Sequence, residues 1–308
     1  AAQKDHDHAL ADFNEAIRLD PKQTMAFFNR GLFYAEQKDR DRAIADFSEV
    51  IKLDPKMTSA FYNRGIANRA KGNMDGAIAD LTEAIRLDPK STKYLNTRGN
   101  VYRAKRDYEH AIADFNEVMR LEPNSAAGFY NRGYTYRLMG RRDQAVADLT
   151  EAIRLDPKDA DAFEERALAY YGLADPDHGL ADYAEAIKLN PKEPRLHNGR
   201  CYARVTTGRE LPEAIADCTE ALRLGPKYGL ALQNRGHAYL RTGQFDLALA
   251  DFEARLALGK SAYALYGRGV AKLKKGDSSG SVDIAVAKGV QSDVAAYYSS
   301  RGVPAPQP

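Results

Sequence analysis

A repeat of 34 residues runs through almost the whole chain and constrains its fold more than any other feature. Proline recurs at that interval in successive repeats, with a last step of 35 residues: Pro21, Pro55, Pro89, Pro123, Pro157, Pro191 and Pro226. An Arg-Gly pair recurs at nearly the same interval from Arg30-Gly31 to Arg268-Gly269, with Arg166-Ala167 and Arg200-Cys201 as variants. A period in this range is typical of a solenoid, in which each repeat buries its apolar face only by stacking on its neighbours.

Each repeat contains two amphipathic helical segments joined by a short turn, as residues 58–91 illustrate. The first segment spaces Phe61 and Gly65 at a helical interval, and the second carries apolar residues at steps of three and four. Gly72 lies in the turn between them, and Pro89 ends the second helix. The repeat therefore predicts an all-α fold built from helical hairpins.

The repeat resembles the tetratricopeptide repeat (TPR). Counting places from the start of the repeat 24–57, it has an aromatic near the start, Gly at place 8, Tyr at 11, Ala at 20, a large apolar residue at 24 and Pro at 32: Phe27, Gly31, Tyr34, Ala43, Phe47 and Pro55. The Asn-Arg-Gly and Ala-Ile-Ala-Asp runs are also similar to bacterial repeat proteins of the alphaproteobacterial type. The resemblance implies a right-handed superhelical solenoid whose first helices line a concave groove.

We expect one continuous solenoid over residues 1–302. Its expected parts are a lone second helix at 5–20, repeats at 24–57, 58–91, 92–125, 126–159, 160–193, 194–228 and 229–261, a degenerate repeat at 262–292, a cap helix at 293–301 and a disordered tail at 303–308. Because the chain opens in mid-repeat without Met, we expect that a leader or an upstream part has been removed.

Composition argues against several classes of function. A formal net charge of +2 is too small to give the positive electrostatic potential that attracts nucleic acid. No apolar run is long enough for membrane insertion. The chain carries no Gly-rich phosphate loop after a strand and no cysteine pairs with metal spacing. The sequence thus predicts no enzyme, no cofactor and no metal site.

Charged residues recur at two places that should meet inside each hairpin. Arg takes place 7 and Asp takes place 23, which in the first four complete repeats are Arg30, Asp46, Arg64, Asp80, Arg98, Asp114, Arg132 and Asp148. A repeated charge on a packing face is tolerable only when an opposite charge neutralises it. We predict a ladder of structural Arg-Asp ion pairs, and the alternative is that the arginines bind an anionic ligand.

The concave groove should take its side chains from places 2, 5, 6, 9, 12 and 13. Place 6 carries a row of asparagines, similar to the peptide-binding row of O-linked N-acetylglucosamine transferase but broken at Thr97, Glu165 and Gly199: Asn29, Asn63, Asn131 and Asn234. Basic and aromatic residues gather across 58–159: Arg69, Arg103 and Arg137 at place 12 with Lys93, Tyr62, Tyr130 and Tyr134. They favour an acidic peptide or a carboxylate, and the alternative is a solvated face with incidental charge.

Asn100 and Asn131 also match two places of the carboxylate clamp by which TPR co-chaperones hold the C-terminal tails of heat-shock chaperones. Asn96, Asp161 and Glu165 stand at its basic places, which argues against that clamp. His237 should face the groove at place 9, either as passive lining or as a group that makes binding sensitive to pH near about 6 to 7.

Two cysteines stand at places that touch in a TPR hairpin, Cys201 at place 8 and Cys218 at place 24. They form either a disulfide or two buried thiols. A disulfide would indicate a periplasmic or secreted protein, and free thiols a cytoplasmic one.

The favoured hypothesis is a non-catalytic scaffold that binds a partner protein or extended peptide, with an acidic ligand favoured by the groove. The alternatives are a regulatory or assembly segment of a larger enzyme or secretion complex, and a structural solenoid that self-associates through its ends.

Overall fold

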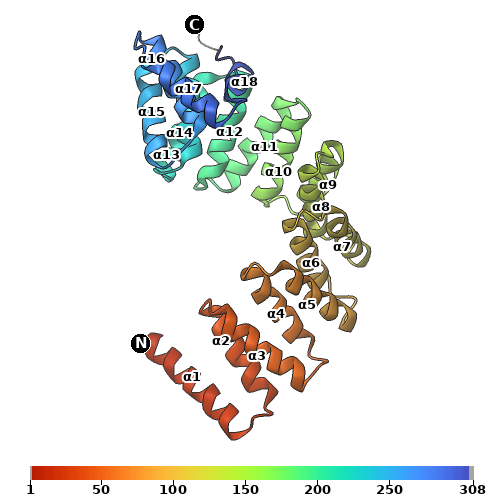
Figure 1. The fold of residues 1–308 in the computed structure, drawn as a ribbon. Helices are drawn as coiled ribbons and strands as arrows, with labels where there is room; N and C mark the ends of the chain where they lie inside the picture. The colour runs from red at the N-terminus through yellow and green to blue at the C-terminus, as the bar shows by residue number, and fades with distance from the viewer. Residues whose placement is uncertain (1, 305–308) are drawn as a thin grey trace. The chain divides into compact units, whose positions relative to one another are not determined.

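The computed structural model describes residues 2–304, with side chains from residue 8 onward. Within that range the chain forms helices and no strand (Figure 1). The first helices of the hairpins are α2 (Thr24–Glu36), α4 (Thr58–Ala70), α6 (Thr92–Ala104), α8 (Ala126–Leu138), α10 (Ala160–Gly172), α12 (Pro194–Thr207), α14 (Gly229–Arg241) and α16 (Ala262–Lys274). The second helices are α1 (Ala2–Leu19), α3 (Arg40–Leu53), α5 (Met74–Leu87), α7 (Tyr108–Leu121), α9 (Arg142–Leu155), α11 (Pro176–Leu189), α13 (Leu211–Leu224), α15 (Phe245–Ala257) and α17 (Gly280–Val290), and α18 (Val294–Ser299) follows.

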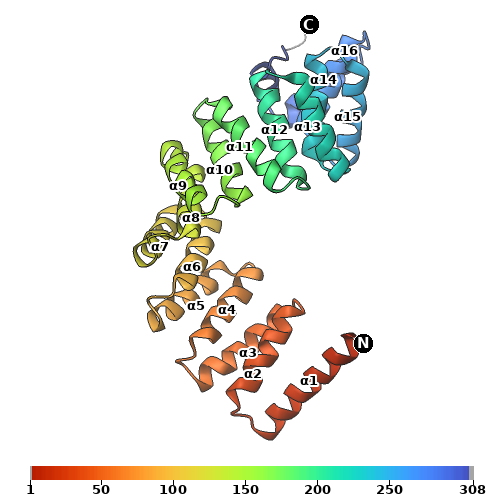
Figure 2. The same cartoon turned by 180° about the vertical axis from the view of Figure 1, so that it is seen from behind.

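The chain divides into two compact units, an N-terminal unit ending at Leu155 and a C-terminal unit beginning at Asp156. Within each unit every hairpin packs against the next one along the chain (Figures 1 and 2). Successive first helices also touch each other, as α6 and α8 do in the N-terminal unit and α12 and α14 in the C-terminal unit. The first helices therefore lie on the inner side of each stack.

The turn inside each hairpin follows from local backbone chemistry. Gly72 adopts a left-handed φ of 88°, a conformation that glycine reaches without a steric penalty. Asn73 then caps α5 by accepting a hydrogen bond from the Gly76 backbone N–H. Asp39 and Asp107 cap α3 and α7 in the same way. These caps fix where each second helix begins.

Close helix packing explains the recurring glycine at place 8. A Cβ atom on Gly31 would lie 2.8 Å from Cε1 of Phe47, and one on Gly99 would lie 2.6 Å from Cε1 of Phe115. The rings at place 24 are fully buried in both hairpins. Only a residue without a side chain allows the two helices to approach so closely.

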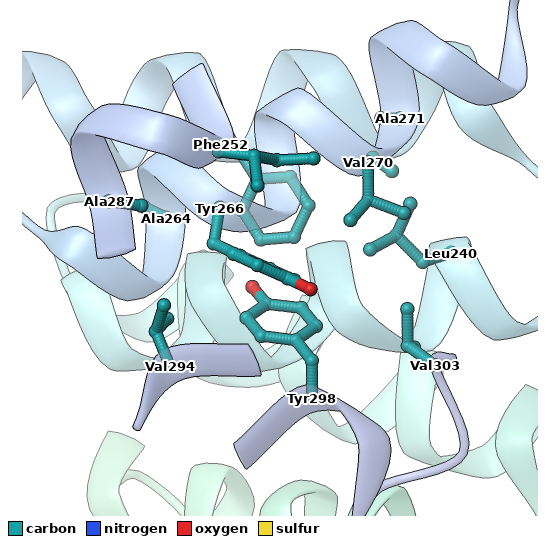
Figure 3. Close-up of a cluster of buried hydrophobic side chains, with 12 residues drawn as sticks. Leu240, Phe252, Ala264, Tyr266, Val270, Ala271, Ala287, Val294, Tyr298 and Val303 are labelled. Carbon is teal, nitrogen blue, oxygen red and sulfur yellow. The ribbon is translucent and has the colours of Figure 1, made fainter. Parts of the chain in front are cut away.

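The C-terminal unit ends on a tyrosine cluster rather than on a simple cap. Tyr298 of α18 packs against Tyr266, with ring centroids 4.8 Å apart (Figure 3). Tyr298 also stacks on His237, again with ring centroids 4.8 Å apart. Val303 is 5% exposed and packs in the same core cluster as Leu240. The sequence thus wrongly includes Val303 in a disordered tail, and residues 305–308 lie outside the described part. The helix expected at 293–301 is shorter and packs on α14 and α16.

Candidate functional site

In eight hairpins of the described part, the Arg at place 7 of the first helix pairs with the repeated Asp of the second helix. Arg30 donates hydrogen bonds from Nε and Nη2 to the two carboxylate oxygens of Asp46, at 2.8 and 2.7 Å. The same pairing recurs at Arg64-Asp80, Arg98-Asp114, Arg132-Asp148, Arg166-Asp182, Arg200-Asp217, Arg235-Asp251 and Arg268-Asp283. The aspartates are buried, and the carboxylate of Asp114 raises the pKa of Arg98 through these bonds. Each guanidinium group thus uses the N–H groups of Nε and Nη2 to bind the carboxylate of its own hairpin.

A third hydrogen bond from several of these arginines joins neighbouring hairpins, and the sequence analysis missed it. Nη1 of Arg64 donates to Oγ of Ser48 at 3.0 Å, and Nη1 of Arg98 donates to Oγ1 of Thr82 at 3.0 Å. Arg30 bonds Asn14 in the same way. The signal was present, because the acceptor is a small polar residue two places after the preceding hairpin's Asp.

The asparagines at place 6 do not form an open row. Asn131 and Asn234 are buried, and each donates from Nδ2 to an asparagine one repeat earlier: Asn131 to Oδ1 of Asn96 at 3.3 Å and Asn234 to Oδ1 of Asn198 at 3.0 Å. Asn63 donates to the backbone of its own helix, whereas Asn29 is exposed. Two of the four expected groove asparagines, Asn131 and Asn234, thus link successive first helices, which agrees with a row that is not continuous.

Basic and aromatic side chains gather on α4, α6 and α8, on the inner side of the N-terminal unit. Nζ of Lys93 lies 4.1 Å from the ring centroid of Tyr62. The guanidinium groups of Arg103 and Arg137 lie 4.4 and 5.1 Å from the ring centroid of Tyr134. We call these five residues the basic aromatic surface.

Hydrogen bonds hold one of these arginines in position. Nη1 of Arg103 donates to both Oδ1 and the backbone carbonyl of Asn131, at 3.1 and 3.2 Å. Tyr130 packs against Tyr134 with ring centroids 6.2 Å apart, and Arg69 is exposed on α4. Among the described residues, the buried Oδ1 atom of Asn100 has no hydrogen-bond partner.

Family comparisons match the repeat over most of the chain. The model described as "Tetratricopeptide repeat" matches residues 1–58, 35–92, 164–229 and 234–293, which together make more than half of the chain. The model described as "TPR repeat" matches residues 99–140 and 133–173. The chain belongs to the tetratricopeptide repeat family. Proteins of this family generally mediate protein–protein interactions and are typically non-catalytic. No curated protein matches the chain.

Solved TPR structures share the fold at low sequence identity. A tetratricopeptide repeat protein from Parabacteroides merdae is 18% identical with a TM-score of 0.61, over 79% of this chain and 98% of that chain. The PilF protein of Pseudomonas aeruginosa is 18% identical with a TM-score of 0.56, over 66% and 92%. A chain of the APC/C Cut9–Hcn1 assembly is 15% identical with a TM-score of 0.61, over 94% of this chain and 57% of that one. These likenesses show the fold alone.

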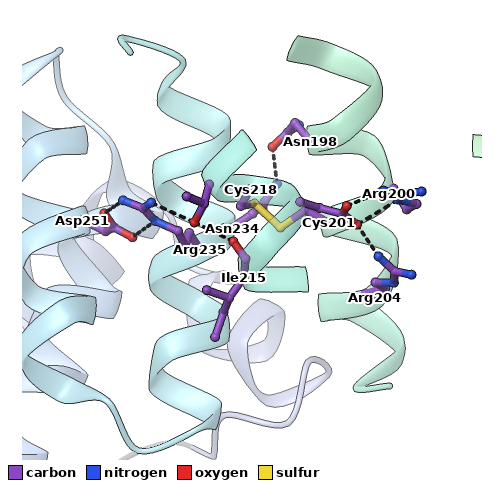
Figure 4. Close-up of a disulfide and its surroundings, with 11 residues drawn as sticks. Asn198, Arg200, Cys201, Arg204, Ile215, Cys218, Asn234, Arg235 and Asp251 are labelled. Atoms are coloured by element: carbon purple, nitrogen blue, oxygen red, sulfur yellow. Dashed lines mark hydrogen bonds and ion pairs between the residues drawn. A yellow bond between two sulfur atoms is a disulfide. The ribbon is translucent and has the colours of Figure 1, made fainter. Parts of the chain in front are cut away.

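This TPR chain departs from the family pattern where Cys201 and Cys218 replace the glycine and the large apolar residue. The structure joins them in a disulfide between α12 and α13, with Cα atoms 5.5 Å apart (Figure 4). Both cysteines are fully buried. Of the two alternatives that the sequence allows, the structure contains the disulfide.

His237 does not face an open groove. Its side chain is buried beneath α18, stacked on Tyr298, with Nε2 3.3 Å from the backbone carbonyl oxygen of Arg301. Burial, with smaller contributions from the nearby charges of Arg241 and Arg301, lowers the pKa of His237 to about 4. The expectation that His237 faces the groove is therefore wrong, for either of its two suggested roles, because residues far along the chain cover it.

Other kinds of site have little support in the described part of the TPR chain. No group of three His, Cys, Asp or Glu side chains among those residues could hold a metal ion. None of the described helices is long and apolar enough to cross a membrane.

Proposed function

We propose that the N-terminal unit is a non-catalytic scaffold that binds an acidic segment of a partner protein along its inner side. The main support for this proposal is that the guanidinium groups of Arg103 and Arg137 both lie close to the ring of Tyr134. Lys93 and Tyr62 repeat that combination on the adjoining helices. A partner carboxylate can thus meet several cationic groups on one surface.

The basic aromatic surface is suited to a carboxylate because parts of it are already held in place. The guanidinium is planar, so it can pair with a carboxylate through two parallel hydrogen bonds. Asn131 restrains Arg103 before any ligand arrives, which reduces the conformational entropy lost on binding. The tyrosine rings add apolar contact area for the rest of the segment.

A fluorescent acidic peptide tests this proposal directly. The chain contains no Trp, so the emission of a peptide with the sequence Glu-Glu-Trp-Glu reports binding without background. We expect Arg103→Gln to weaken binding by about ten- to hundredfold, since the lost charge-assisted hydrogen bonds contribute about 1.5–3 kcal/mol. Raising the salt concentration should weaken it further.

The matched control is Arg154→Gln. Arg154 is exposed on α9 and pairs with Glu151 one turn earlier, so its loss removes the same charge from a different surface. Equal weakening by both variants, or no binding of the peptide, would contradict the proposal. Mass spectrometry of proteins that co-purify with the intact chain, but not with the Arg103 variant, would then identify the partner.

A further inference from the structure

A second recess lies on the inner side of the C-terminal unit, and none of its aromatic residues belongs to the surface described above. Its volume is about 310 Å³, and its walls come from α10, α11, α12 and α14, from the residue just before α14 and from one residue of α18. The aromatic lining consists of Tyr183, Tyr202, Tyr228 and Tyr297. The volume is at the low end of the ~300–1,000 Å³ range of small-molecule pockets, which suits one large side chain.

Glycine at place 6 allows the ring of Tyr183 to lie against α12, where both residues line the recess. A Cβ atom on Gly199 would lie 2.7 Å from Oη of Tyr183, so the tyrosine ring fills the space beneath α12. Tyr183 takes place 24, where the equivalent residues Phe47 and Leu149 lack a hydroxyl group. The glycine and the tyrosine together form an apolar floor, and a side chain at position 199 would displace it.

The lining of the recess is apolar at its mouth as well as at its floor. Leu230 is 54% exposed although it lines the recess, and Leu168 faces it from α10. Tyr297 closes one side, held by the guanidinium of Arg301 at 3.7 Å from its ring centroid. Nη2 of Arg301 also donates to Oη of Tyr202 at 2.9 Å, which connects α18 to α12. An exposed leucine beside aromatic rings gains free energy when an apolar side chain covers it.

Acidic side chains surround the opposite side of the recess. Arg195 forms ion pairs with Asp161 and Glu164 of α10, and Glu193 lies 3.7 Å from its Nε atom. One guanidinium thus faces three carboxylates. Even with Lys227 beside Glu193 and Arg195, the three carboxylates outnumber the two cationic groups, which favours a cation over an acidic segment at this edge of the recess.

We propose that this recess binds a large aromatic side chain from a basic segment of a partner protein, with an adjoining Lys or Arg meeting the carboxylates around Arg195. The tyrosine rings and Leu230 supply the apolar contacts, and the carboxylates select the charge. The site is independent of the basic aromatic surface, because it lies in the other unit and selects the opposite charge.

The test uses the intact chain and two Trp peptides, Lys-Lys-Trp-Lys and Ser-Ser-Trp-Ser. We expect the emission of the basic peptide to shift to the blue as its indole leaves water, and its affinity to exceed that of the neutral peptide about tenfold. Leu230→Ser should weaken the basic peptide about tenfold, because the exposed leucine contributes apolar contact and is not needed for folding. Leu247→Ser is the matched control, since Leu247 is 48% exposed on α15 and lies outside the recess.

A charge variant tests the other half of the proposal. Asp161→Asn should weaken the basic peptide about threefold and leave the neutral peptide unchanged, while Asp177→Asn, which removes an exposed partner of Arg209, should change neither. The proposal is overturned if the basic peptide does not bind, if the neutral peptide binds equally well, or if Leu247→Ser weakens binding as much as Leu230→Ser.

Discussion

At the scale of single residues, the repeat predicts which charged side chains pair within a hairpin, but not which residues of the neighbouring hairpin they contact. Arg64 and Asp80 recur with a fixed spacing on faces that must pack, so their pairing follows from the cost of burying one charge alone. The bond from Arg64 to Ser48 could not be derived in the same way. It depends on how one hairpin is set against the previous one, and hydroxyl groups are equally tolerated at exposed positions.

The buried pairs predict a specific loss of stability. Replacing Asp80 with Ala leaves the guanidinium of Arg64 without its carboxylate, and we expect the free energy of unfolding to fall by about 2–3 kcal/mol, because Arg64 keeps some access to water. Asp12→Ala is the control, because Asp12 holds the equivalent place in α1 but is exposed and forms no ion pair within the described residues. Urea unfolding measures both, and similar midpoints for the two variants would contradict the structural role.

His237 predicts a second effect, which depends on pH. Its folded-state pKa of about 4 lies below the ordinary value of 6.5, so the unfolded chain takes up a proton first as the pH falls. The stabilisation is therefore present above about pH 6.5 and is lost toward pH 4, by up to about 3 kcal/mol. Urea unfolding across this range should show a steeper loss for the wild type than for His237→Phe, which keeps a ring against Tyr298 and cannot be protonated. Parallel pH profiles would show that His237 is not the group responsible.

At the scale of whole helices, the sequence predicts the hairpins well because each one is specified locally. Caps, apolar spacing and proline fix the bounds of α3 and α5 without reference to distant residues. The position of α18 is different. Ser281 and Lys288 of α17 stand where earlier second helices carry the apolar residues that receive the next hairpin, as Ile44 does beside Ala67. That polar face indicates where the stack ends, but not that α18 packs over His237.

The disulfide between α12 and α13 should stabilise its hairpin by restricting the unfolded chain. The two cysteines are 17 residues apart, and closing a loop of that length contributes about 3 kcal/mol in the chain-entropy description. We expect the Cys201→Ala, Cys218→Ala double variant to unfold at lower temperature than the oxidised protein. The control is to add a reductant, which should lower the unfolding temperature of the wild type but not that of the double variant. Two titratable thiols in unreduced protein would contradict the disulfide.

At the scale of the whole molecule, the binding surfaces are harder to predict than the fold. The basic residues of the N-terminal unit stand at one place in successive repeats, so sequence reasoning collects Arg69, Arg103 and Arg137 without a structure. The recess of the C-terminal unit has no such periodic signal. It is lined by Gly199, Tyr183 and Tyr297, which belong to three different helices. These residues do not recur at equivalent places of the other repeats, so only the structure shows that they lie together.

The two proposed binding activities should separate when the chain is divided after Leu155. Each compact unit contains its own core clusters and its own Arg-Asp pairs, and solenoid repeats depend mainly on their neighbours. We therefore expect the fragments 1–155 and 156–308 to fold separately, as judged by helical circular dichroism and cooperative melting. The acidic Trp peptide should bind only the first fragment and the basic Trp peptide only the second. Binding of the basic peptide to a folded fragment 1–155 would contradict this expectation. It would show that the basic peptide does not need the recess beside Leu230.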